Sequence, residues 1–228
     1  MDNMKNERYH GPLIENPVSL AYIKLFPWIA LFLSGFMLVG SLFEDKRGVL
    51  TVLFLLCTLI SLISILLSFI KKFIYRFQSF TYLLIALIVL SLLLDLNFIG
   101  LMMFVNGGEV FSRVYSFASA IYVIVMLVIF IIACSLYAWH YLPKNQGKVW
   151  KINQWETYGV KGKSKKGQFA TNFWPAFGAI IFLGSLITGY IQNVFGIFLG
   201  VLMSSTFPAV FVDALYAAVY VRKHPESE

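Results

Sequence analysis

Charged residues are scarce in this chain: Asp, Glu, Lys and Arg together make up 13% of its 228 residues, against 59% hydrophobic residues. Soluble globular domains carry roughly 25% charged and 45–50% apolar residues. A soluble fold of this size needs a polar surface, which this composition does not supply. The shortage of charge therefore excludes a soluble globular domain and favours a membrane protein.

Cysteine and histidine are also rare, with two and three residues. Cys57 and Cys134 both lie inside apolar runs, so the sequence predicts neither a disulfide framework nor a C-x-x-C pair. The histidines are far apart, and none belongs to an H-E-x-x-H motif. We therefore expect no metal site, no cofactor and no catalytic residues, and we expect that the chain is not an enzyme.

Long apolar runs dominate the rest of the sequence. A helix needs about 20 apolar residues to cross a hydrocarbon core of roughly 30 Å. Four runs of about this length, and one longer run that must fold back near Gln192 and Asn193, predict about six membrane-spanning helices. A barrel is excluded because the runs lack alternation with a period of two. The runs cover residues 26–43, 49–69, 82–105, 117–141 and 173–221.

The basic residues fall mainly on one side of these predicted spans. Of the 18 Lys and Arg residues, 15 lie before the first span or after the second, fourth or sixth. Cytoplasmic loops of membrane proteins carry such an excess of positive charge. The sequence thus predicts an all-α, polytopic transmembrane helix bundle of about six spans, with both the N and the C terminus in the cytoplasm.

These boundaries divide the chain into three regions. Residues 1–25 are a cytoplasmic tail, with a short interfacial helix expected at residues 16–25, where Asn and Pro provide a helix start. Residues 26–221 are the transmembrane domain, which includes a basic cytoplasmic loop at residues 142–172, and residues 222–228 are a second cytoplasmic tail. The excess of Lys over Arg, 13 to 5, is typical of AT-rich bacterial genomes and indicates a bacterial plasma membrane.

Two acidic residues lie inside the predicted spans, Asp95 in the third and Asp213 in the sixth. A charged side chain at the centre of a membrane helix costs about 2.5–3.5 kcal/mol on insertion scales, so these acids are functional candidates. Together with Asn97 and Ser205 they form a candidate intramembrane polar site. The alternative is that each acid makes a structural hydrogen bond to a neighbouring helix.

Small residues form a ladder along the sixth span. Gly196, Gly200 and Ser204 recur every four residues and include a G-x-x-x-G pattern, which lets a second helix backbone approach closely. Packing within the chain is the first interpretation, and formation of a homo-oligomer is the alternative.

Four lysines of the basic loop are spaced by small residues beside the expected inner leaflet. Each such charge contributes about 1 kcal/mol near an anionic lipid surface. We expect the cluster to contact anionic headgroups, and the alternative is an acidic protein partner. Nucleic acid is not an expected partner, because the basic residues lie in loops between apolar runs. The cluster comprises Lys161, Lys163, Lys165 and Lys166.

Two hypotheses on function follow. The first is a non-enzymatic membrane protein that acts through protein contacts, as an immunity, accessory or secretion-associated factor. The second is a small transporter or channel that couples protons or cations through Asp95 and Asp213. A vitamin-uptake subunit ranks lower, because residues 29–39 are bulky where such a subunit shows small residues.

Overall fold

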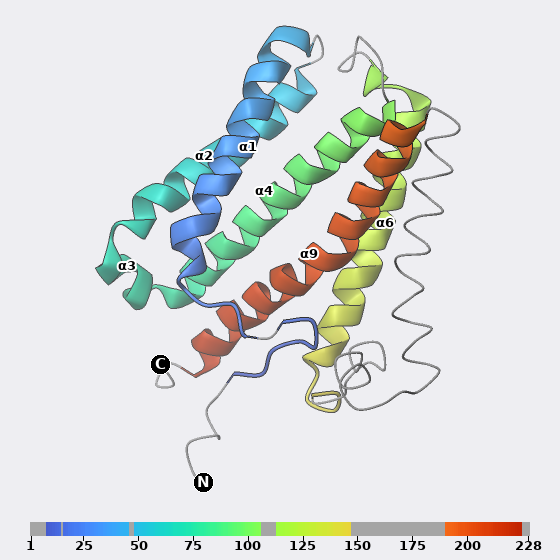
Figure 1. Ribbon diagram of the computed structural model, residues 1–228. Helices are drawn as coiled ribbons and strands as arrows, with labels where there is room; N and C mark the ends of the chain where they lie inside the picture. Colours follow the sequence, from blue (N-terminus) through green and yellow to red (C-terminus); the bar gives the residue numbers. More distant parts are fainter. Residues whose placement is uncertain (1–7, 15, 46–47, 106–112, 147–189, 225–228) are drawn as a thin grey trace, which may run out of the picture.

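The computed structural model describes residues 8–14, 16–45, 48–105, 113–146 and 190–224 (Figure 1). Within these ranges the regular secondary structure is helical, and no strand occurs. The helices are α1 (Tyr22–Glu44), α2 (Val49–Ser68), α3 (Lys71–Arg76), α4 (Gln78–Val105), α6 (Phe117–His140) and α9 (Ile191–Lys223).

Five of these helices are long and apolar enough to cross a membrane: α1, α2, α4, α6 and α9. This is consistent with an integral membrane protein and confirms the all-helical part of the prediction. The expected fifth span, in the first half of residues 173–221, lies outside the described residues apart from its end. The count of six spans and the cytoplasmic placement of the termini stay predictions.

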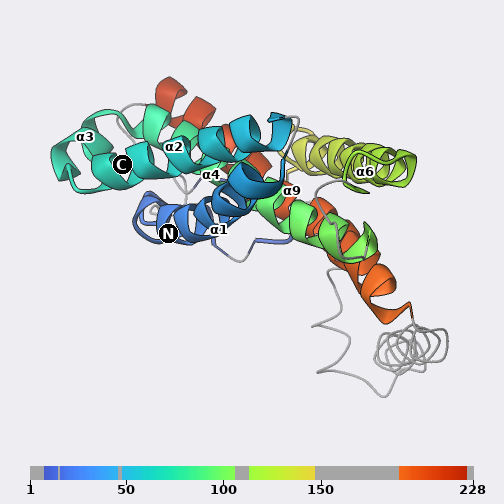
Figure 2. The same cartoon turned by 90° about the horizontal axis from the view of Figure 1, so that it is seen from above.

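Helices α4 and α9 form the centre of the bundle and run antiparallel. At one end of the pair, the Ser79 hydroxyl donates a hydrogen bond to the Ala218 carbonyl at 2.7 Å. At the other end, the Asn193 side chain donates to the Phe104 carbonyl. Figures 1 and 2 show α1 and α2 on one side of this pair and α6 on the other.

The second half of the long apolar run forms helix α9, whereas the fold-back expected near Gln192 stays a prediction because residues 147–189 lie outside the described part of the chain. Helix α9 begins at Ile191, so both corner residues lie in its first turn rather than before it. With 33 residues the helix is roughly 50 Å long, which exceeds a hydrocarbon core of roughly 30 Å. A helix of this length must tilt or extend beyond the core.

The described N-terminal residues and the end of α9 lie at the same end of the bundle. Arg8 contacts Asp213 of α9, and the Gly11 N–H donates to the hydroxyl of Tyr141, directly after α6. Figure 1 shows this N-terminal segment beside the lower parts of α9 and α6. The described residues thus enter and leave the bundle at the same end, and the even number of crossings stays a prediction.

The N-terminal segment differs from the expected short helix at residues 16–25. Residues 16–19 are not helical, and α1 begins at Tyr22, so Pro27 lies inside the helix rather than in its first turn. The Val18 N–H donates to a side chain of α9, and its carbonyl accepts from Arg8. These tertiary hydrogen bonds replace the ones that a local helix would have made.

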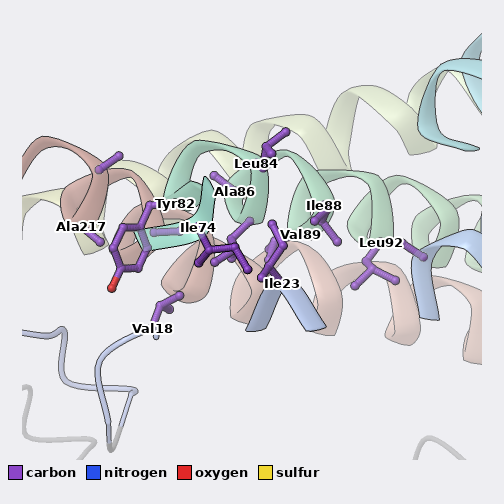
Figure 3. Packing of buried hydrophobic residues seen from close by; sticks show 14 residues of the cluster. Val18, Ile23, Ile74, Tyr82, Leu84, Ala86, Ile88, Val89, Leu92 and Ala217 are labelled. Carbon is purple, nitrogen blue, oxygen red and sulfur yellow. The ribbon is translucent and has the colours of Figure 1, made fainter. Parts of the chain in front are cut away.

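Helix α4 is the most enclosed element of the bundle. Around it, side chains from four other segments meet in one apolar cluster: Val18 of the N-terminal segment, Ile23 of α1, Ile74 of α3 and Ala217 of α9 (Figure 3). The outer helices instead expose large apolar side chains, such as those of Phe36, Leu66 and Ile124. Apolar exposure of this extent suits contact with lipid rather than with water.

Candidate functional site

Asp213 lies near the end of α9, fully buried, and three groups from elsewhere in the chain bind its carboxylate. Arg8 places Nη1 3.3 Å from Oδ2. The Val18 N–H donates to the same oxygen at 2.7 Å, and the Tyr141 hydroxyl donates to Oδ1 at 2.6 Å. The acid is therefore paired with a cation and saturated by donors, which offsets the cost of burying its charge.

The partners of Asp213 are themselves held in place. Arg8 is almost fully buried; it also donates to the Val18 carbonyl at 2.6 Å and lies over the Tyr82 ring, 5.6 Å from its centroid. The Tyr141 hydroxyl accepts from the Gly11 N–H at 2.9 Å. The result is a network, which we call the N-terminal clasp, that fastens residues 8–18 to α4, α6 and α9.

The phenol of Tyr141 shows the electrostatic consequence of this arrangement. Burial raises the pKa of Tyr141 far above its usual value, and the negative charge of Asp213 raises the pKa further. Ionisation of the phenol would remove its donated hydrogen bond and set a second negative charge against the carboxylate. The clasp therefore keeps the Tyr141 hydroxyl protonated.

Asp95 lies in the middle third of α4 and has a different environment. The Ser34 hydroxyl of α1 donates to its Oδ2 at 2.5 Å. The residue is fully buried, and among the described residues its Oδ1 has no hydrogen-bond partner. A buried carboxylate oxygen without a donor is costly when charged, so this acid is far less well satisfied than Asp213.

The other predicted polar residues do not join the acids in one site. Asn97 accepts a hydrogen bond from the Ser204 hydroxyl of α9 at 3.2 Å, whereas Asp95, two residues earlier, contacts α1. Residues two apart point to different faces of a helix. Ser205 is only partly buried and donates to the Leu202 carbonyl of its own helix at 3.0 Å.

The two acids also lie at different depths. Asn97 pairs with Ser204, so Asp95 lies at about the level of Ser204 in the antiparallel pair. Asp213 follows Ser204 by nine residues, which corresponds to roughly 13 Å along a helix axis. The four predicted residues thus divide into a clasp at the end of the bundle, a pair between α4 and α9, and an isolated acid between α4 and α1.

The small-residue ladder of α9 lies against α4 and α6 of the same chain. A Cβ atom on Gly196 would collide with the Gly100 carbonyl of α4, and one on Gly200 would collide with the Tyr122 hydroxyl of α6. Ser204 is buried in the same contact. The ladder lets α4, α6 and α9 approach closely, with the Tyr122 hydroxyl donating to the Gly196 carbonyl at 3.2 Å.

The contacts of the lysine cluster and the absence of a metal site both stay predictions. The lysine cluster lies outside the described residues: Lys161, Lys163, Lys165 and Lys166. Within the described part of the chain, no group of three or more His, Cys, Asp or Glu side chains is arranged to hold a metal ion.

Sequence reasoning missed the N-terminal clasp. In the sequence, Arg8 was only one of the 15 basic residues counted for orientation, and Tyr141 was only the last residue of the fourth apolar run. The signal that could have found their role is Asp213 within an apolar run, because a charged side chain in a membrane helix is costly unless it is paired. Sequence alone offers several cations as that partner.

These contacts define a helical protein whose spans suit a membrane and whose N-terminal segment is fastened across one end of its bundle. Comparisons with protein-family models, with curated proteins and with solved structures find no match.

Proposed function

We propose that this chain is a non-enzymatic, multi-pass membrane protein that acts through protein contacts, as an immunity, accessory or secretion-associated factor. The observation that carries the proposal is the environment of Asp213. All three of its described partners are structural groups, and the acid has no exposure to water. An acid that holds the fold together in this way is not available as a carrier of protons or cations.

The separation of the acids supports the same view. A coupled transporter needs its charged groups to face a shared, hydrated path, whereas Asp95 and Asp213 are both sealed in helix contacts and lie roughly 13 Å apart in depth. The proposed point of contact for the partner is the lysine cluster predicted beside the membrane. Its positive charge suits an acidic protein surface.

Photo-crosslinking from the basic loop tests this proposal. A benzophenone amino acid replaces Trp155, and adducts formed in intact bacterial membranes are identified by mass spectrometry. We expect one dominant protein adduct, which is lost when all four lysines are changed to Gln and kept when they are changed to Arg. A loop that forms no protein adduct, or one whose adduct is insensitive to the Gln changes, would contradict the proposal. The four lysines are Lys161, Lys163, Lys165 and Lys166.

A second function, proton passage through Asp95 alone, is favoured by one observation. The Oδ1 atom of this acid is buried and lacks a hydrogen-bond partner among the described residues. This environment suits a carboxyl group that holds a proton and can pass it to an acceptor. In proteoliposomes under an imposed membrane potential, this function requires proton uptake that Asp95→Asn abolishes and Ser205→Ala leaves intact. Equal flux in wild-type protein, Asp95→Asn and empty vesicles would exclude it.

A further inference from the structure

A groove of about 900 Å³ opens at the clasp end of the bundle, between the start of α4 and the last two turns of α9. The hydrogen bond from Ser79 to the Ala218 carbonyl joins its two walls. Because α4 begins at Gln78 and α9 ends at Lys223, the groove lies at the ends of two helices that are long and apolar enough to cross a membrane.

Two arginines mark the rim of the groove. Arg76 ends α3, with its guanidinium 5.9 Å from the centroid of the Phe77 ring, and Arg222 lies in the last turn of α9. Both side chains are exposed, and no acidic residue lines the groove within the described part of the chain. The rim is therefore positively charged, and it suits an anion with several oxygens.

Apart from polar residues such as Gln78 and Ser79, the walls of the groove are apolar. On α4, Phe80 and Leu83 expose 45% and 43% of their surface, and on α9 Val219 exposes 52%. Leu215, also a lining residue, lies seven residues before Arg222, which corresponds to roughly 10 Å further into the span. A ligand that fills this groove must combine a negative head with an apolar tail.

We propose that this groove binds one anionic phospholipid. Its phosphate lies between Arg76 and Arg222, and an acyl chain follows Phe80, Leu83 and Val219 toward the centre of the bilayer. The proposal is independent of the protein contacts proposed above, because it involves neither the lysine cluster nor a second protein. Such binding differs from general attraction to an anionic surface, because Arg76 and Arg222 select the headgroup.

Native mass spectrometry in a neutral detergent tests the charged rim. The probes are phosphatidylglycerol and phosphatidylcholine with identical acyl chains. We expect the wild-type protein to prefer phosphatidylglycerol, and Arg76→Gln with Arg222→Gln to lower its affinity for that lipid about tenfold. The matched control, Lys24→Gln with Lys144→Gln, removes two exposed charges outside the groove and should keep the preference. An equal loss in both double variants would show a diffuse charge effect and overturn the proposal.

Two further measurements test the apolar wall. Val219→Trp fills the groove without changing charge, and it should weaken binding of phosphatidylglycerol several-fold, whereas Leu136→Trp on the exposed face of α6 should not. Glycerol 1-phosphate, which carries the headgroup charge without acyl chains, should fail to displace the lipid. Unchanged binding in Val219→Trp, or displacement by glycerol 1-phosphate at lipid concentrations, would show that no lipid occupies the groove.

Discussion

At the scale of single residues, the two acids within the spans differ because, within the described part of the chain, a cation contacts Asp213 but none contacts Asp95. Asp213 meets Arg8 near the end of the bundle, where the N-terminal segment folds back, whereas Asp95 lies deeper and meets a serine hydroxyl. Removal of one member of a buried ion pair leaves the other charge unpaired, and this costs more than the pair itself contributes.

The first prediction concerns this pair. Asp213→Asn leaves Arg8 buried without a counter-charge, and we expect a loss of about 3 kcal/mol in the free energy of unfolding. The measurement is denaturant or thermal unfolding in detergent. Ser205→Ala, on the same helix, should lie within about 0.5 kcal/mol of wild type, since the Ser205 hydroxyl bonds to its own helix turn and the variant keeps the carbonyl that accepts from Tyr137. Equal stabilities for the two variants would show that the clasp does not hold the fold.

The second prediction concerns pH. The pKa of Tyr141 is raised in the folded protein, so its contribution to stability is fully present below the ordinary tyrosine pKa of about 10 and is lost as the pH rises above that value. We expect the melting temperature of the wild type to fall between about pH 9.5 and 11 more steeply than that of Tyr141→Phe. Parallel curves for the two proteins would argue against the buried phenol.

Contacts between individual residues were the least predictable feature of the sequence. Sequence reasoning identified Asp95 and Asp213, because a charge in an apolar run is rare and costly. It also grouped them with Asn97 and Ser205, which the structure separates, because proximity between helices depends on the rotation and depth of each helix. A single sequence shows where the apolar runs lie, but it does not show how each helix is rotated relative to its neighbours.

At the scale of elements, helix boundaries were largely predictable and their contacts were not. Helix α6 begins at Phe117, where the sequence analysis placed the start of the fourth span, and the Ser116 hydroxyl caps it by accepting from the Ser119 N–H. Val105, the predicted end of the third span, is the last described residue of α4. Helix α1 began earlier than expected because Ile23, one turn before Pro27, packs into the core around α4. This burial depends on tertiary contacts, which the local sequence does not contain.

The third prediction concerns the close contact between α4 and α9. Gly196→Ala sets a Cβ atom against the backbone of α4, which cannot move as a flexible side chain would, and we expect a loss of about 1–3 kcal/mol. Gly35→Ala on α1 is the matched control, because a Cβ atom there meets nothing within 4 Å. It should be neutral or slightly stabilising. Thermal unfolding of both variants measures the difference, and a control that loses as much as Gly196→Ala would refute the contact.

At the scale of the whole molecule, the clasp lies at the same end of the bundle as two exposed basic residues. The clasp fixes the described N-terminal segment to the same end of the bundle as the last turn of α9. That end also carries Arg76 and Arg222, in agreement with the excess of basic residues predicted on the cytoplasmic side. If one end of the chain faces the cytoplasm, the clasp requires the other to face it as well.

The last prediction tests this orientation. In a background with Cys57 and Cys134 changed to Ser, a single cysteine is placed at Ser227 or at Arg113 and exposed to a membrane-impermeant maleimide in intact cells. We expect Ser227→Cys to react only after the membrane is opened, and Arg113→Cys to react at once, because the basic excess holds the tails inside. The reverse pattern would place the lipid groove and the clasp at the outer leaflet. Labelling of both sites from outside would mean an odd number of crossings. That result would contradict the ion pair of Arg8 and Asp213, which holds both ends of the described chain on one side.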